Sequence, residues 1–285
     1  MSDNNSVVVI LTFNSANIIK ETLGQALKVT ANVYVVDSGS KDGTDEIARS
    51  MGCEVAQRPF QNYGEQRNWA ISQVRDRYTW QLHLDADEVL DQAAITAIRA
   101  VIDGKPQYEA YMIKRRDYFM GRQLRFSGVN PWHLRLFKST VGQCENRMYD
   151  QHFIATCPVG KLKGLMHDKN SMAIGDWVAR HNRWSDLEAD QVARQEYSGH
   201  GVLKARFFGD GRERARFYRK MYYTVLPVSL RGIPYFIYRY FFRLGIADGM
   251  PGFYFAFFQA LWFRLLVDAK IYERQHKTEQ SGNPV

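Results

Sequence analysis

The stretch LHLDADEVLD, from Leu82 to Asp91, begins as an apolar strand and then places Asp85, Asp87 and Glu88 directly behind it. Grouping carboxylates at the end of a buried strand is unfavourable, because like charges repel and burial removes their hydration. The pattern therefore indicates that a positive group belongs there. Asp-x-Asp supplies the oxygen ligands that hard divalent cations prefer, and such a cation can hold a diphosphate. An acidic loop, or a helix N-terminus that favours carboxylates, would explain the same residues without a ligand.

Apolar strands and helices alternate around this stretch. Strands are predicted at 6–14, 32–37, 53–58 and 78–85, and the helices between and after them include one capped by Thr44 and one over 91–104. Strands and helices that alternate at this spacing form right-handed βαβ units and a parallel sheet. No G-x-G-x-x-G follows the first strand and no P-loop is present, which disfavours a dinucleotide-binding domain.

The pattern changes after residue 104. Residues 108–127 predict a hairpin around Gly121, and 133–139 and 161–168 predict further strands. We expect this half to add antiparallel or mixed strands to the sheet. The predicted domains are 1–199, made of the halves 1–104 and 105–199, followed by a helical region at 200–285.

The last third of the chain carries the charge imbalance. Residues 200–285 contain 14 Lys and Arg but only 6 Asp and Glu, which accounts for the whole net charge of +8. The same region is rich in Phe, Tyr and Trp, and its longest charge-free run, 249–263, is shorter than the roughly 20 residues of a membrane span. This composition predicts basic amphipathic helices in a membrane interface. Packing on the catalytic sheet or on a second subunit is the alternative.

The three cysteines, Cys53, Cys144 and Cys157, are widely spaced and form no CxxC pair. Their spacing predicts neither a zinc site nor a disulfide framework and fits a reducing cytosol. The first residues carry no basic segment followed by a long apolar core, so a secretory signal is not expected.

Polar clusters follow three of the predicted parallel strands. Ligands of such sheets bind beyond the carboxyl ends of the strands, so these clusters should converge. A strand-end carboxylate such as Asp37 can accept a hydrogen bond from a base, and small neighbours let a nucleotide approach. Arg67, in GEQRN, is a cation that could face phosphate. The predicted nucleotide-sugar contacts are Thr12, Phe13, Asn14, Asp37, Ser38, Gly39, Arg67, Asp85, Ala86 and Asp87.

The segments VVVILTFN, VVDSGSKDGT, GEQRN and LHLDADE together resemble the donor-binding half of family-2 glycosyltransferases. Later segments, from RLFKSTVGQ to HNRWSDLEA, are similar to bacterial lipopolysaccharide-core β-1,4-glucosyltransferases, and 243–260 to related cell-surface polysaccharide enzymes. The resemblance implies an α/β fold of the GT-A type, a Rossmann-like mixed sheet with helices on both faces, followed by a basic, aromatic-rich helical region.

The resemblance also implies an inverting transfer from a nucleotide donor, with UDP-sugar expected. Asp87 and Asp85 would bind Mg²⁺ or Mn²⁺, with Asp85 contacting ribose or a metal-bound water. The family's catalytic Glu, preceded by His, corresponds to Asp150, preceded by Tyr149, so Asp150 is the predicted base and Glu145 the second candidate. A loop carboxylate paired with Arg147 is the structural alternative for Asp150.

The expected acceptor is a lipid-linked glycan of lipopolysaccharide or exopolysaccharide, reached from the cytoplasmic face of the inner membrane. Weak candidates for the acceptor side are Trp132, His133, Arg135 and His167, residue types that more often serve packing. A polyprenyl-phosphate glycosyltransferase and a non-catalytic membrane-associated scaffold are alternatives. Nucleic acid is not an expected partner, since no nucleic-acid-binding motif appears, and the C-terminal helices could also form a homo-oligomer.

Overall fold

The computed structural model describes residues 5–145, 151–169, 172–193, 206–209, 213–214, 217–218, 221 and 230–281. The side chains of 191, 193 and 277–281 are not described. The chain divides into two compact units. The first contains 1–116, 130–169 and 201–203, and the second contains 117–129, 170–200 and 204–285.

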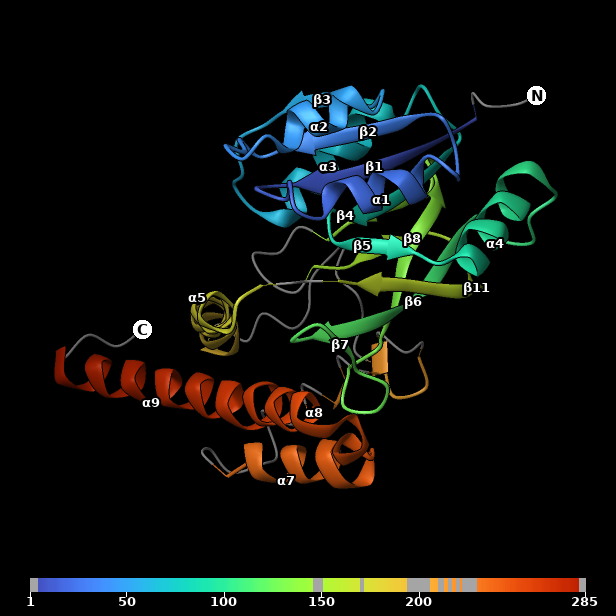
Figure 1. The fold of residues 1–285 in the computed structure, drawn as a ribbon. Coiled ribbons are helices and arrows are strands. Elements are labelled where there is room, and N and C mark those ends of the chain that lie inside the picture. The colour runs from blue at the N-terminus through green and yellow to red at the C-terminus, as the bar shows by residue number, and fades with distance from the viewer. Residues whose placement is uncertain are drawn as a thin grey trace. The chain divides into compact units, whose positions relative to one another are not determined.

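The first unit begins with four parallel strands and their helices (Figure 1). The predicted alternation of strands and helices is confirmed. The helix after β2 is not capped as predicted, because Gly43 occupies the N-cap position with no side-chain cap. The elements are β1 (Ser6–Thr12), α1 (Ile19–Ala26), β2 (Val33–Asp37), α2 (Thr44–Ser50), β3 (Glu54–Gln57), α3 (Tyr63–Val74), β4 (Trp80–Asp85) and α4 (Gln92–Asp103).

Antiparallel strands complete the sheet, so the expected mixed architecture is confirmed. The additional elements of the first unit are β5 (Glu88–Leu90), most of β6 (Ala110–Phe119), β8 (Trp132–Lys138) and β11 (Val159–Asp168). The strand order is β3-β2-β1-β4-β8-β6-β11-β5. A separate small sheet pairs β9 (Gly142–Cys144) with β10 (Phe153–Ala155).

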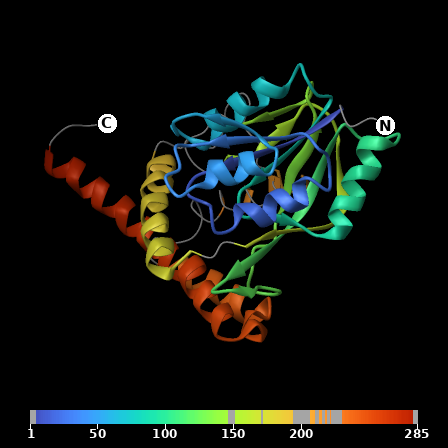
Figure 2. The ribbon, with the colours of Figure 1, turned by 45° about the horizontal axis from the view of Figure 1, so that its top comes forward.

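Strand β1 lies in the middle of the core and is buried on both faces. Val8 and Ile10 pack in one cluster with Leu23 of α1, whereas Val7 and Val9 pack in another cluster that includes residues of α3. Alternate side chains of a strand point to opposite faces, so a continuous apolar run is what a doubly covered strand requires. Helices α1 and α3 accordingly lie on opposite faces of β1 (Figures 1 and 2).

The second unit is mainly helical and aromatic, as predicted for the C-terminal region. The end of β6 forms a hairpin with β7 (Arg122–Gln123) through Met120 and Gly121, whose φ angles are 49° and 72°. Two consecutive positive φ angles are typical of a two-residue hairpin turn. The remaining elements are α5 (Ile174–Ala193), α7 (Gly232–Ile237), η1 (Tyr238–Phe242), η2 (Gly245–Asp248), α8 (Gly249–Ala256), η3 (Phe257–Trp262) and α9 (Phe263–Ser281).

Aromatic side chains form the core of this unit. Phe119 meets Trp177 and Phe255 edge-on, with ring centroids 5.7 and 5.4 Å apart. A fully buried ion pair joins Arg231 to Asp268 and ties α7 to α9. Among the described residues, one helical run, 245–276, has the length and composition of a membrane-crossing helix, properties that buried helices of soluble proteins share.

Candidate active site

The register of the parallel strands brings the predicted polar residues to one edge of the sheet. Thr12 pairs with Asp37 across β1 and β2, and Leu11 pairs with Asp85 across β1 and β4. The last residues of these three strands therefore lie side by side at the carboxyl edge. This is the place where open α/β sheets bind ligands.

Asp37 shapes the loop that follows β2. Its side chain is fully buried, and one carboxylate oxygen accepts hydrogen bonds from the backbone N–H groups of Gly39 and Ser40 at 2.9 and 2.8 Å. The other oxygen accepts a hydrogen bond from the Ser40 hydroxyl. Gly39 has a φ of 89°, a conformation that disfavours any side chain. The carboxylate thus fixes a tight turn, with Ser38 held at its start by a backbone bond to Thr12 at 3.0 Å.

The loop after β1 is fastened to the loop after β2. The Asn14 N–H donates to the Ser40 hydroxyl at 2.8 Å, and the Asn14 side chain accepts from the Lys41 N–H at 2.9 Å. Thr44 joins the same network, because its hydroxyl accepts from the Ser15 N–H at 2.8 Å instead of capping α2. Phe13 remains 59% exposed between these ties. The two loops therefore form one preorganised surface.

Thr12 has an unusual place on that surface. Its residue is 4% exposed, and its hydroxyl has no hydrogen-bond partner among the described residues. A buried hydroxyl without a partner is costly, and such groups call for an explanation such as a missing ligand or water. The position of Thr12 beside Asp37 suits a ligand at the strand ends.

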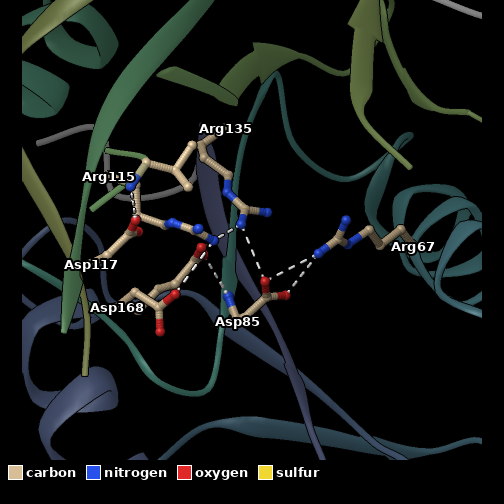
Figure 3. A network of polar contacts seen from close by, with 8 residues as sticks. Arg67, Asp85, Arg115, Asp117, Arg135 and Asp168 are labelled. Carbon is tan, nitrogen blue, oxygen red and sulfur yellow. Dashed lines mark hydrogen bonds and ion pairs between the residues drawn. The ribbon is translucent and has the colours of Figure 1, made fainter. Parts of the chain in front are cut away.

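Asp85 is the centre of an ion-pair network (Figure 3). Arg67 from α3 donates to both of its oxygens at 3.0 and 3.1 Å, and Arg135 from β8 reaches it at 3.2 Å. Burial alone would raise the pKa of Asp85, but the two guanidinium groups outweigh it and hold the pKa well below its usual range. The Asp85 side chain is therefore ionised at neutral pH.

Glu88 holds the turn after β4 in place. One oxygen accepts from the Asp85 N–H at 2.9 Å, and the other forms an ion pair with Arg135 at 2.5 Å. Between them, the Ala86 N–H donates to Leu11 at 3.1 Å, which extends the ladder past the end of β4. The Ala86 carbonyl accepts from the Thr22 hydroxyl at 2.6 Å. These hydrogen bonds and the ion pair hold the D-A-D-E turn in place.

Asp87 is the carboxylate that this network leaves without a cation. Among the described residues no ion pair involves it, whereas Asp168, which pairs with Glu88 across β11 and β5, lies 3.4 Å from Arg115. Burial, followed by the negative charges of Asp168, Asp85 and Glu88, raises the pKa of Asp87 to about 8. Asp87 is therefore the carboxylate of this cluster that no cation of the described residues compensates.

The donor set at Asp87 fits Mg²⁺ or Mn²⁺ when a ligand completes the coordination. In the described part of the chain, no three His, Cys, Asp or Glu side chains are grouped closely enough to hold a metal by themselves. Magnesium is commonly held by one or two carboxylates together with substrate phosphates. Asp87 is a partly exposed carboxylate with a raised pKa, and it lies two residues from the ionised carboxylate of Asp85. This pair matches that arrangement.

The GEQRN segment of α3 connects three parts of the site. Gln66 donates to the Ser38 hydroxyl at 3.3 Å, and Arg67 holds Asp85. Asn68 donates to the Cys144 carbonyl and accepts from the Cys144 N–H, both at 2.9 Å, which fastens β9 to α3. One helical turn therefore positions the β2 loop, the carboxylate cluster and β9.

Comparison with known proteins identifies this arrangement. The family model described as glycosyl transferase family 2 matches residues 7–157, more than half of the chain. The chain belongs to glycosyl transferase family 2. It is accordingly a glycosyltransferase, and the strand-end cluster lies within the part that the family model matches.

Relatives match beyond that domain. The lipopolysaccharide core biosynthesis glycosyltransferase LpsC of Rhizobium meliloti is 26% identical over 88% of this chain and 86% of its own length. An uncharacterized glycosyltransferase of Rickettsia bellii is 26% identical over 86% of this chain and 78% of its own. Among solved structures, a mannosyltransferase of Pyrobaculum calidifontis in complex with GDP-Man and Mn²⁺ covers 94% of this chain and 87% of its own at a TM-score of 0.53 and 15% identity, which supports the fold.

The structure places the proposed acceptor-side residues of this glycosyltransferase in different environments. Arg135 belongs to the carboxylate network and is 3% exposed. His133, on the same strand, is half-buried, and its buried Nε2 atom has no partner among the described residues; desolvation lowers its pKa well below the usual value. Trp132 lies under the Lys161 ammonium at 5.0 Å, and His167 is on β11, opposite Val89.

The two candidate bases flank a gap in the described residues. Asp150, Tyr149 and Arg147 lie outside the described residues, so the role of Asp150 stays a prediction. Glu145 is fully buried and accepts from the His152 N–H at 2.9 Å, with the His152 ring nitrogen 3.3 Å away. These contacts join the two described residues Glu145 and His152, and the role of Glu145 as the second candidate base stays a prediction.

Several residues of the glycosyltransferase site were not predicted from the sequence. Arg115 and Asp168 meet only because β6 and β11 are neighbours in the sheet, an order that the sequence does not reveal. Glu88 was noted with the acidic stretch, but its structural role depends on Arg135. The signal that could have indicated Asp168 is its position at the end of the predicted strand 161–168.

Proposed function

We propose that this glycosyltransferase transfers a sugar, with inversion, from a UDP-sugar to a hydroxyl of a lipid-linked glycan in lipopolysaccharide or exopolysaccharide biosynthesis. The observation that carries the proposal is the uncompensated carboxylate of Asp87 at the strand ends of a family-2 fold. The similarity to a lipopolysaccharide core biosynthesis glycosyltransferase over 88% of the chain supports the acceptor class.

The donor nucleotide occupies the fastened loops after β1 and β2. Thr12, Phe13 and Asn14 line the uridine site together with Asp37, Ser38 and Gly39. The unpartnered Thr12 hydroxyl is available for a hydrogen bond, and the turn fixed by Asp37 keeps backbone and side chains in place before the donor arrives. Preorganisation of this kind lowers the cost of binding.

The diphosphate lies near Asp85 and Asp87. Asp87, assisted by Asp85, would hold Mg²⁺ or Mn²⁺, and the bound cation would supply positive charge for the departing diphosphate. Arg67 and Arg135 keep Asp85 ionised, and Arg67 faces the phosphates from the opposite side of that carboxylate. The sign of the charge at each position is thereby set before the donor binds.

The transfer itself needs a base on the acceptor side. The acceptor hydroxyl oxygen attacks the anomeric carbon while the bond from that carbon to the diphosphate oxygen breaks, and Asp150 takes the hydroxyl proton. An Asp has a pKa of about 3.9 in solution, so it is ionised at neutral pH and can accept a proton. The diphosphate leaves with the electron pair of the broken bond, and the configuration at carbon inverts.

The acceptor places the enzyme at the cytoplasmic face of the inner membrane. The basic, aromatic region 200–285 supports peripheral association, because anionic lipid headgroups attract Lys and Arg while aromatic side chains enter the interface. Association of the enzyme with the membrane would bring it to the surface that carries the lipid-anchored acceptor.

Nucleoside diphosphate release from a panel of sugar nucleotides, with Mn²⁺ and a lipid-linked acceptor extract, tests the proposal. UDP release from a UDP-sugar that requires acceptor and metal supports it, and Asp150→Asn should abolish transfer while leaving donor binding intact. Turnover of GDP-mannose alone would replace the donor. Full activity of Asp150→Asn would favour transfer to a polyprenyl phosphate, which needs no base for a hydroxyl. No turnover of any donor would favour the scaffold.

A further inference from the structure

In the second unit, the side chain of Asp248, at the end of η2, organises the segment that follows β7. Its carboxylate accepts hydrogen bonds from the backbone N–H groups of Arg125, Phe126 and Ser127 at 2.7–3.0 Å, and from the Ser127 hydroxyl at 2.7 Å. Arg239, 1% exposed, donates to the Ser127 carbonyl. The segment after β7 is thereby fixed to η1 through Arg239 and to the end of η2 through Asp248.

Glycine makes this close approach possible. A Cβ atom on Gly252 would lie 2.4 Å from the Gly245 carbonyl oxygen and 2.6 Å from the Asp248 Cβ, so no larger residue fits. These five hydrogen bonds and the tight packing at Gly252 hold the two segments together. The hydrogen-bonded segments therefore form a rigid element, and the surface of this element is apolar.

Large apolar side chains point outward from this element. Exposed apolar side chains near the Asp248–Ser127 contacts in the sequence include Phe126 (38%), Val129 (43%), Phe241 (52%), Phe242 (77%), Leu244 (55%), Ile246 (53%) and Met250 (59%). We call these seven residues the apolar tip. Clustered exposed apolar residues on a rigid support are typical of an interaction surface.

Leu244 shows that exposure of the tip is maintained against a local cost. Its φ is 58° and its ψ is 32°, the left-handed region, which costs a leucine roughly 1 kcal/mol or more relative to glycine or asparagine. Strained backbone that carries an exposed side chain points to a function for that side chain.

The charges around the tip select its partner. Arg122 and Arg125 are exposed and Arg243 is half-buried, whereas the carboxylate of Asp248, at the end of η2, accepts the hydrogen bonds described above. A positively charged rim around aromatic and aliphatic side chains fits an anionic lipid bilayer, with apolar groups among the acyl chains and guanidinium groups at the headgroups.

We propose that the apolar tip inserts into the anionic membrane and is the principal lipid contact of the enzyme. This rests on the proposed membrane association and deepens it by assigning the lipid contact to the seven residues of the apolar tip instead of the whole region 200–285. The site is separate from the strand-end carboxylates, so its test needs neither donor nor acceptor.

Leu244→Asn separates lipid binding from folding, because Asn tolerates a positive φ better than Leu does. Partition of the purified full chain onto vesicles of phosphatidylcholine with phosphatidylglycerol should fall about tenfold, the effect of losing one partly buried leucine. The thermal midpoint should stay equal or rise. The matched control is Tyr272→Gln on α9, which removes a residue 58% exposed that lies about 33 Å along the helix from Met250.

Unchanged binding by Leu244→Asn, or an equal loss in Tyr272→Gln, would overturn the assignment. So would a dimer that dissociates on Leu244→Asn in sedimentation experiments without vesicles, since the tip would then contact a second copy. Binding that is equally strong on pure phosphatidylcholine would contradict the role of the charged rim. UDP binding by the same variants distinguishes failure of this assignment from failure of the proposed enzyme activity, which requires a donor site.

Discussion

Asp87→Asn should stabilise the metal-free protein while removing its metal-dependent donor binding. In the folded chain, burial and three neighbouring carboxylates raise the pKa of Asp87 from 3.8 to about 8. When folding raises the pKa of an acid, ionising that acid in the folded state costs free energy. The cost is absent below the unfolded pKa of about 4, grows as the pH rises, and is complete above about 8. Asparagine has nearly the same shape and no charge.

The magnitude follows from that shift. A rise of about four in the pKa of Asp87 would correspond to a cost of about 5 kcal/mol in the free energy of folding. Water at the partly exposed carboxylate and titration of its neighbours reduce this, and we expect about 2 kcal/mol, or a rise of about 5 °C in the thermal midpoint. Calorimetry in chelator-containing buffer at pH 4.5, 6.5 and 8.5 measures the difference between wild type and variant, which should increase with pH.

The same substitution two residues earlier is the matched control with the opposite sign. Asp85→Asn leaves Arg67 and Arg135 without their shared carboxylate, so it should destabilise by about 2 kcal/mol or more. A lower thermal midpoint for Asp87→Asn at pH 8.5, or a difference that does not vary with pH, would refute the charge account of the site.

Three further predictions concern other parts of the chain. Asn68→Ala removes both hydrogen bonds to Cys144 and should lower the free energy of unfolding by about 2 kcal/mol in denaturant titrations, whereas an unchanged midpoint would show that β9 does not depend on α3. Asp248→Ala should destabilise by about 2–3 kcal/mol at pH 7. Because hydrogen bonds outweigh burial and lower the pKa of Asp248, that loss should shrink as acid protonates the wild-type group; a loss independent of pH would contradict this. Glu145→Gln should keep measurable sugar transfer while Asp150→Asn should not, and the reverse result in a single-turnover assay would exchange their roles.

The sequence predicted those features that depend on local pattern. The apolar run at β1 and the acidic turn after β4 have periodicity and neighbours that indicate a buried parallel strand and its exit, and their register then places Asp37 and Asp85 together. The hairpin at Gly121 was predictable for the same reason, because a turn residue separates two strand patterns.

Features that depend on strand order could not be predicted in this way. Arg135 was expected on the acceptor side, but the pairing of β4 with β8 brings it to Asp85 and Glu88. Thr44 has the residue type of a helix cap, yet its hydroxyl is taken by Ser15 from the preceding loop. In both cases a long-range partner determined the role of a side chain whose local sequence indicated another.

We expect the strand ends to bind a nucleoside diphosphate through a divalent cation at Asp87. Isothermal titration of UDP into the purified protein, with and without Mn²⁺, measures this binding. We expect UDP to bind to the wild type only with Mn²⁺, and this binding to be lost in Asp87→Asn, although that variant is more stable than the wild type at pH 8.5. UDP binding of equal strength with chelator, or with Asp87→Asn, would contradict it.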